Sequence, residues 1–81
     1  MKILITDLSR KTTEDELSKL FTAYGIVSST TIIMDKITGK SKGFGFVEMV
    51  HEKEALLAIK KLNKSTVNGE RMSVKKKKDS E

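Results

Sequence analysis

Apolar residues recur along the chain at two spacings, every second residue in some segments and every third or fourth residue in others. The first spacing, with its β-branched residues, predicts strands at residues 2–8, 26–34, 43–50 and 71–75. Asn68 and Gly69 indicate a tight turn just before the last of these strands. Within that strand the alternation is expected to direct Met72 and Val74 inward.

The second spacing predicts a helix after the first strand. Its apolar residues fall at positions i, i+3, i+4 and i+7, namely Leu17, Leu20, Phe21 and Tyr24. Thr13 is the expected N-cap, and Glu16 three positions later completes a capping box. Gly25 is expected to end this helix.

A second helix is predicted at residues 52–62, without a strong N-cap signal. Its apolar residues repeat the same spacing, namely Ala55, Ala58, Ile59 and Leu62. The element order is therefore β-α-β-β-α-β, with Thr38 and Gly39 turning the chain between the second and third strands. Two helices with one apolar stripe each can bury those stripes on one face of a four-stranded antiparallel sheet. We therefore expect an α+β, ferredoxin-like fold whose other sheet face is open.

The open face is expected to carry two aromatic rings. Alternation along the third strand places Phe44, Phe46 and Glu48 on one face of the sheet. The residues between them are expected to face the helices, namely Gly45, Val47 and Met49. Flat rings with cations nearby are suited to stacking the bases of single-stranded nucleic acid. The cations expected around this face are Lys2, Lys36, Lys40, Lys42 and Lys75.

Composition narrows the function further. The chain has 81 residues, which suits one domain, and its 16 Lys and Arg exceed its 11 Asp and Glu to give a net charge of +5. Such a surplus favours a polyanionic partner. The chain has no Cys and one His, so thiol chemistry and the usual zinc sites are excluded, and we expect no catalytic residue, metal or cofactor. Its apolar runs are too short for a membrane span, so a cytoplasmic monomer with no membrane partner is expected.

Three segments together carry a family resemblance. Residues 42–49, Lys-Gly-Phe-Gly-Phe-Val-Glu-Met, resemble the octamer motif of the RNA recognition motif family in seven of eight positions. Residues 3–8 resemble the hexamer motif of that family, and residues 35–42 resemble its loop between strands two and three. The similarity runs from about residue 2 to residue 76, so the domain is expected at residues 1–76. It is greatest to small single-domain bacterial RNA-binding proteins. Residues 77–81 are expected to be a basic, disordered tail.

The resemblance implies roles for matching residues. It implies that Phe46 stacks on a base, that Phe44 packs against riboses and that Lys42 meets a phosphate. Residues of the fourth strand and the lysines after it often add contacts in this family. The expected RNA-binding residues are therefore Lys2, Leu4, Thr6, Ile33, Lys42, Phe44, Phe46, Ser73, Lys75 and Lys76.

Three positions depart from the family pattern. Leu4 stands where the hexamer usually has Phe or Tyr, so one stacking site is weakened. Asp7 replaces the usual Asn and brings a negative charge to the end of the first strand. Met49 replaces the last aromatic residue of the octamer, but it is expected to face the core, where it only fills space.

The expected function is non-enzymatic binding of single-stranded RNA, with single-stranded DNA left open. We expect dissociation constants on the order of micromolar or weaker, because only two rings and few phosphate contacts are available. An alternative is a protein-interaction module that uses the apolar patch of Leu4, Ile33, Phe44 and Phe46. A third possibility, an acylphosphatase-like enzyme, needs an Arg in an anion-binding loop, and neither Arg10 nor Arg71 has that context.

Overall fold

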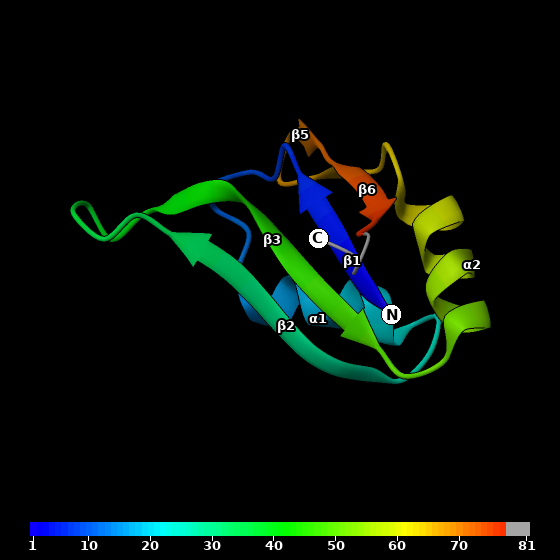
Figure 1. Ribbon diagram of the computed structural model, residues 1–81. Helices are drawn as coiled ribbons and strands as arrows, with labels where there is room; N and C mark the ends of the chain where they lie inside the picture. Colours follow the sequence, from blue (N-terminus) through cyan, green and yellow to red (C-terminus); the bar gives the residue numbers. More distant parts are fainter. Residues whose placement is uncertain (78–81) are drawn as a thin grey trace.

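The computed structural model describes residues 1–77. Figure 1 shows a twisted sheet with α1 and α2 on one side of it, and within residues 1–77 no helix lies on the other side. The elements are, in chain order, β1 (Lys2–Thr6), α1 (Glu14–Thr22), β2 (Val27–Met34), β3 (Ser41–Met49), α2 (Glu52–Leu62), β4 (Thr66–Val67), β5 (Glu70–Arg71) and β6 (Ser73–Lys76). The main sheet has the order β2-β3-β1-β6, and every neighbouring pair in it is antiparallel. The predicted ferredoxin-like fold is confirmed.

The core lies between the sheet and the two helices. Both central strands supply fully buried residues to it, and the helices contribute the predicted stripes. Leu17 and Phe21 are buried on α1, and Ala55, Ala58 and Leu62 are buried on α2. The remaining stripe residues pack against this core while partly exposed, namely Leu20, Tyr24 and Ile59. Burial of apolar surface thus holds both helices on the same face of the sheet.

The start of α1 has the predicted capping box. The Thr13 hydroxyl accepts a hydrogen bond from the backbone N–H of Glu16 at 3.2 Å. The Glu16 carboxylate accepts one from the backbone N–H of Thr13 at 3.0 Å, and another from the side-chain amide of Asn68 at 3.3 Å. The pKa of the Glu16 carboxyl is lowered, mainly by the hydrogen bond from the backbone N–H of Thr13.

The prediction that Gly25 ends α1 was wrong. The helix ends at Thr22, its C-cap Ala23 has right-handed backbone angles, and Gly25 is not among the residues with positive φ. What Gly25 provides is space, because a Cβ there would overlap the side chain of Glu54 on α2. The Glu54 carboxylate accepts a hydrogen bond from the backbone N–H of Ile26 at 3.1 Å. Gly25 therefore allows α2 to hold the start of β2.

The predicted last strand is divided into two elements. Glu70–Arg71 pairs with Thr66–Val67 in a separate small hairpin, and only Ser73–Lys76 joins the main sheet. Asn68 and Gly69 have φ of 53° and 86°, which suits the tight hairpin turn that connects β4 and β5. Met72 lies between the two elements and is buried, as is Val74. The inward direction of Met72 and Val74 is confirmed, but the continuous strand is not.

Other strand boundaries also differ from the predictions, most clearly at the end of β1 and the start of β3. β1 ends at Thr6 because Asp7 adopts a left-handed φ of 58°, a conformation that Asp and Asn tolerate better than most residues. β3 begins two residues earlier than predicted, at Ser41. Within residues 1–77, neither helix is long and apolar enough to cross a membrane, and no group of three or more acidic or His residues is placed to hold a metal ion. Apart from Lys77, the predicted tail lies outside the described residues.

Candidate nucleic-acid interface

Phe46 lies near the centre of the open sheet face. It sits on β3 directly opposite Leu4 of β1 on one side and Thr31 of β2 on the other. Phe44 lies two residues before it on the same face, and both rings are partly exposed. The two ring centroids are 6.4 Å apart and the ring planes are perpendicular, at 89°. One ring therefore presents its edge to the other, a favourable aromatic arrangement.

Gly45 and Val47, the residues that follow Phe44 and Phe46, show which way the two rings point. Gly45 and Val47 are buried, so the pleat of β3 directs Phe44 and Phe46 away from the helices. A Cβ at Gly45 would overlap the backbone carbonyl oxygen of Thr31 on the neighbouring strand. The absence of a side chain at this position lets β2 approach β3 closely beneath the rings. Met49 is also buried, as predicted.

Two lysines lie over the Phe46 ring. The Nζ atom of Lys2 is 5.4 Å from the ring centroid, and that of Lys77 is 5.7 Å from it. Both distances are within the range of cation–π attraction. The backbone N–H of Lys77 donates a hydrogen bond of 2.9 Å to the carbonyl oxygen of Lys2, which holds the chain at this place beyond the end of β6.

Lys77 lies outside the set of individually predicted RNA-binding residues, because the sequence interpretation places residues 77–81 in the tail. Strand alternation could have identified it, since Ser73, Lys75 and Lys77 have the same parity. The register supports this, because Ser73 lies opposite Thr6 and Lys75 lies opposite Leu4, both on the open face.

Lys76 is not brought to the Phe46 side of the sheet. It pairs with Ile3, whose side chain is completely buried between the sheet and the helices. Because paired residues point to the same face, the Lys76 side chain leaves the sheet on the helix-covered side. Ile33 has the same parity as Thr31 on β2 and lies partly exposed on the open face.

Two acidic residues lie close to the rings. Glu48 pairs with Lys2 on the open face, and its carboxylate accepts a hydrogen bond of 3.2 Å from the hydroxyl of Ser29. The Asp7 carboxylate accepts one of 3.4 Å from the hydroxyl of Ser73 at the other end of β1. These carboxylates bound the face on two sides and reduce its attraction for polyanions.

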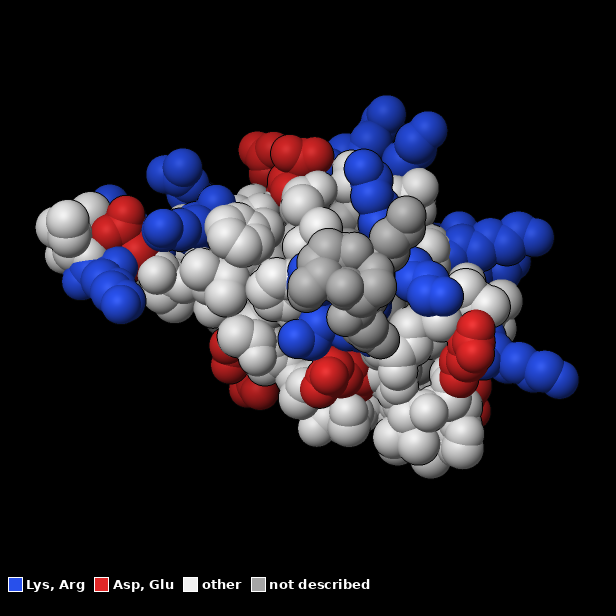
Figure 2. Space-filling view, viewed as in Figure 1, with Lys and Arg blue, Asp and Glu red and all other residues white. Residues whose placement is uncertain are grey.

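Lys42 is the second residue of β3, next to the β2–β3 hairpin. This hairpin extends beyond the helices (Figure 1). Lys42 lines a hollow of about 470 Å³ together with Arg10, Asp35, Thr38, Lys40, Ser41 and Phe44. Figure 2 shows Lys and Arg side chains gathered at this hairpin and, on the opposite side of the molecule, beside β6 and α2. Two lysines of this hairpin were expected around the open face, Lys36 and Lys40. Lys40 lines the hollow, and Lys36 is not among its lining residues.

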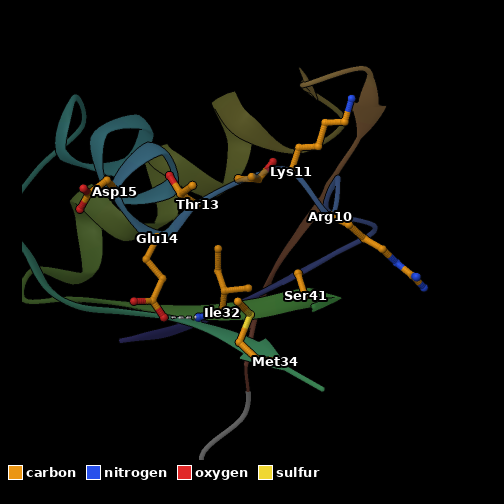
Figure 3. A pocket seen from close by; sticks show the side chains of 9 residues that line it. Arg10, Lys11, Thr13, Glu14, Asp15, Ile32, Met34 and Ser41 are labelled. Carbon is orange, nitrogen blue, oxygen red and sulfur yellow. Dashed lines mark hydrogen bonds between the residues drawn. The ribbon is translucent and has the colours of Figure 1, made fainter. Parts of the chain in front are cut away.

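A second hollow, of about 570 Å³, lies between the start of α1 and the edge strand β2 (Figure 3). The Glu14 carboxylate crosses it and accepts a hydrogen bond of 2.9 Å from the backbone N–H of Ile32. In Figure 3 the Arg10 and Lys11 side chains extend away from the hollow. The Glu14 carboxylate thus occupies this space, which makes it unsuitable for phosphate.

A family model, related sequences and solved structures all show similarity to one protein family. A family model described as RNA recognition motif matches residues 3–73. RbpA of Nostoc sp. (strain PCC 7120 / SAG 25.82 / UTEX 2576) is 40% identical over 81 residues, which cover 100% of this chain and 79% of that protein. Glycine-rich RNA-binding protein 1 of Mycosarcoma maydis is 38% identical over 73 residues, or 90% of this chain. This chain spans only 42% of that relative, and 16% of UBP1-associated protein 2C of Arabidopsis thaliana.

Solved structures have the same arrangement of strands and helices. The crystal structure of RNA binding protein PG1 superposes with a TM-score of 0.89 at 40% identity, covering 93% of this chain and 90% of that one. The Sxl-lethal protein/RNA complex superposes with a TM-score of 0.86 at 34% identity, covering 91% of this chain and 46% of that one.

Proposed function

The chain belongs to the RNA recognition motif family, and on that basis we propose that its open sheet face binds single-stranded RNA. Bases stack on Phe46, riboses pack against Phe44, and lysines at the two ends of the face contact phosphates. The observation that carries this proposal is the pair of partly exposed rings on the sheet face opposite the two helices, with cations placed around them.

The geometry around Phe46 supports a stacking role. The ring lies on the central strand β3, which is hydrogen-bonded to a strand on each side, so its position is held by the whole sheet. Lys2 and Lys77 place two positive charges over the ring. A base that stacks there displaces the two ammonium groups from the ring. The lysine side chains are long enough to carry these groups to the flanking phosphates. The rings thus supply stacking energy, and the lysines supply salt-dependent affinity.

The relatives support the same partner. Glycine-rich RNA-binding protein 1 is named for RNA binding, and the Sxl-lethal protein was solved in complex with RNA. The full lengths of these proteins exceed the region similar to this chain, so the inference is limited to the RNA-binding surface of one domain.

The charges also weigh against a protein-interaction module on the same face. Leu4, Ile33, Phe44 and Phe46 do share the open face, as that alternative requires. However, an apolar partner seated on Phe46 would displace Lys2 and Lys77 from the ring and offer their charges no phosphate in return. A polyanion with flat bases satisfies both the rings and the ammonium groups.

A titration of the isotopically labelled protein with short single-stranded oligonucleotides tests the proposal. We expect the backbone amide signals of residues 42–49 to shift with RNA, and Phe46→Ala to abolish those shifts while the fold remains intact. Leu57→Ala is a matched control, because Leu57 is 44% exposed on α2 and lies on the other layer. Unchanged amide signals of residues 42–49 at a large excess of RNA would contradict RNA binding by this face.

A further inference from the structure

We propose that the corner of the molecule where β3 ends and α2 begins binds a partner protein through an acidic amphipathic helix. This corner, called the α2 corner below, consists of Ile26, Val50 and Leu57. It includes none of the residues of the proposed RNA-binding face. The inference therefore goes beyond RNA binding and assigns an interaction surface to a separate part of the domain.

Three aliphatic side chains are exposed at the α2 corner. The exposed fraction is 57% for Ile26, 54% for Val50 and 44% for Leu57. The backbone N–H of Val50 donates a hydrogen bond of 3.1 Å to the carbonyl oxygen of Ile26, and the backbone N–H of Ile26 donates one of 3.1 Å to the Glu54 carboxylate on α2. In Figure 2 this corner, at the lower right, is formed mainly by uncharged atoms. The fold thus holds an apolar patch at the surface here.

Helix geometry brings Leu57 to this patch and keeps Leu56 away from it. Leu57 lies three residues after Glu54, on the side of α2 that contacts the start of β2. Because the Cα–Cβ bonds of a helix tilt toward its N-terminus, the Leu57 side chain leans toward the end of α2 next to Val50. Leu56 is 46% exposed, but it lies two residues after Glu54 and therefore on the opposite side of the helix. Two adjacent leucines of nearly equal exposure thus differ in position.

Charged residues surround Leu57 on the helix surface. Its neighbours three and four residues away are Lys53, Glu54, Lys60 and Lys61. The three lysines are exposed, whereas the Glu54 carboxylate is directed to the backbone N–H of Ile26. The border of the apolar patch is therefore positive. A partner that covers the patch needs carboxylates around its own apolar residues, because charges across an interface must be complementary.

An acidic amphipathic helix fits these features better than RNA or a second copy of the chain. Aliphatic side chains offer no flat surface on which a base can stack. A second copy packed symmetrically on the α2 corner would bring Lys53 and Lys61 against the same lysines. A helix with apolar residues at positions i, i+3, i+4 and i+7 places an apolar stripe on the corner, and acids beside that stripe meet the lysines. Phe46 stays accessible, so the partner and RNA can bind together.

A titration with two peptides tests the α2 corner. The probe is a peptide of about 14 residues with leucine at positions i, i+3, i+4 and i+7 and glutamate at most others, and its control has the same composition in scrambled order. Each peptide is added to the isotopically labelled full chain without RNA. We expect the amide signals of Ile26, Val50 and Leu57 to shift with the probe, while those of residues 42–46 stay unchanged. Unshifted corner signals at a large excess of probe, or equal shifts with both peptides, would overturn the proposal.

Leu57→Ser and Leu56→Ser are the matched pair of variants. Both replace an exposed leucine of α2 with the same polar residue, so both change the helix propensity equally. Leu57→Ser should weaken binding of the probe about tenfold, because the peptide covers this side chain. Leu56→Ser should weaken it less than about twofold. Equal losses in the two variants would show that the peptide binds elsewhere on α2.

The charge of the border is tested separately. Lys53→Gln/Lys61→Gln should weaken binding of the probe about fivefold and reduce its dependence on salt, because exposed charges are screened by ions. Lys36→Gln/Lys40→Gln, in and next to the β2–β3 hairpin, removes the same charge and should leave binding unchanged. Equal losses in these two variants would attribute binding to net charge and overturn the α2 corner as the site.

Two further probes separate a protein partner from other anionic surfaces. The first is oligouridylate added without peptide, and the second is vesicles of phosphatidylglycerol. Amide shifts of Ile26, Val50 and Leu57 with oligouridylate alone would assign the α2 corner to RNA. Vesicle binding that is lost in Leu57→Ser, without binding of the peptide, would assign it to a lipid surface. Either result overturns the protein partner and leaves RNA binding by Phe46 unaffected.

Discussion

Leu4 lies directly opposite Phe46 across the β1–β3 pair, on the open face of the sheet. The family resemblance places an aromatic ring at this position, and here an aliphatic side chain fills it. The face therefore has a flat surface on β3 but none beside it on β1. A single substitution can supply the missing ring next to one that is already placed.

Leu4→Phe should strengthen RNA binding by about tenfold or more, because base–aromatic stacking contributes roughly 1 to 3 kcal/mol per base. Affinity is measured by fluorescence anisotropy with one oligonucleotide at fixed salt. Leu56→Phe is the control, since Leu56 is 46% exposed on α2. Equal affinities for Leu4→Phe and the unaltered protein would show that no base reaches this part of β1.

Adjacent lysines at the end of β6 should differ in their effect. Lys77 lies over Phe46, whereas Lys76 pairs with buried Ile3 and leaves the sheet on the other side. Lys77→Ala should lower the salt slope of log affinity by about 0.7 and weaken binding about fivefold near 0.1 M salt, as expected for one lost phosphate contact. Lys76→Ala removes the same charge and should have a smaller effect. Identical slopes for the two variants would mean that only the total charge of this segment matters.

Asp7→Asn should raise RNA affinity about two- to fivefold, because it removes a negative charge at the edge of the face, and charges a few ångströms apart in water interact by about 1 kcal/mol. The substitution should not destabilise the fold, since Asn adopts the left-handed φ of 58° as readily as Asp does. Asp15→Asn, on α1, is the charge-matched control for affinity. If both variants gain equally, the effect comes from net charge rather than from the position of Asp7.

The stability contributed by the Glu16 charge should depend on pH. Its pKa is lowered from 4.5 in the folded protein, first by the hydrogen bond from the Thr13 backbone and then by the one from Asn68. A carboxyl group with a lower pKa in the folded than in the unfolded state stabilises the fold above its unfolded pKa, and this stabilisation is lost as the pH falls through the folded value.

Glu16→Gln keeps the shape of the capping box without the charge. The free energy of unfolding, measured with urea and circular dichroism, should therefore be lower for Glu16→Gln than for the unaltered protein near neutral pH. The difference between the two proteins should shrink as the pH falls below about 4.5. A difference that stays constant from neutral to acidic pH would assign the effect to side-chain geometry instead.

Gly25→Ala should lower the free energy of unfolding by about 1 to 3 kcal/mol, the usual cost of inserting a side chain into occupied space. The new Cβ overlaps the side chain of Glu54, which must move and give up its hydrogen bond to the backbone N–H of Ile26. In the Glu54→Gly background, which removes the Cβ of residue 54 as well as its carboxylate, the same substitution should cost much less. Equal costs in both backgrounds would refute the overlap as the cause.

The sequence by itself determined the features that depend on local spacing. The period of two along residues 43–49 places Phe44 and Phe46 on the face opposite Val47 and Met49, because successive side chains of a strand point to opposite faces. The capping box was readable for the same reason, since its partners are three residues apart and hydrogen-bond to each other's backbone. These features require no knowledge of the distant chain.

Tertiary structure alone decided the features that join distant segments. Spacing did not reveal that Gly25 makes room for Glu54, or that Glu70–Arg71 leaves the main sheet for a separate hairpin. It also did not place Arg10 beside the β2–β3 hairpin. Alternation gives the face of the sheet on which Lys77 lies, but not its position over Phe46. Each of these depends on how strands pair and helices pack across tens of residues, and such contacts form only when the whole core is assembled.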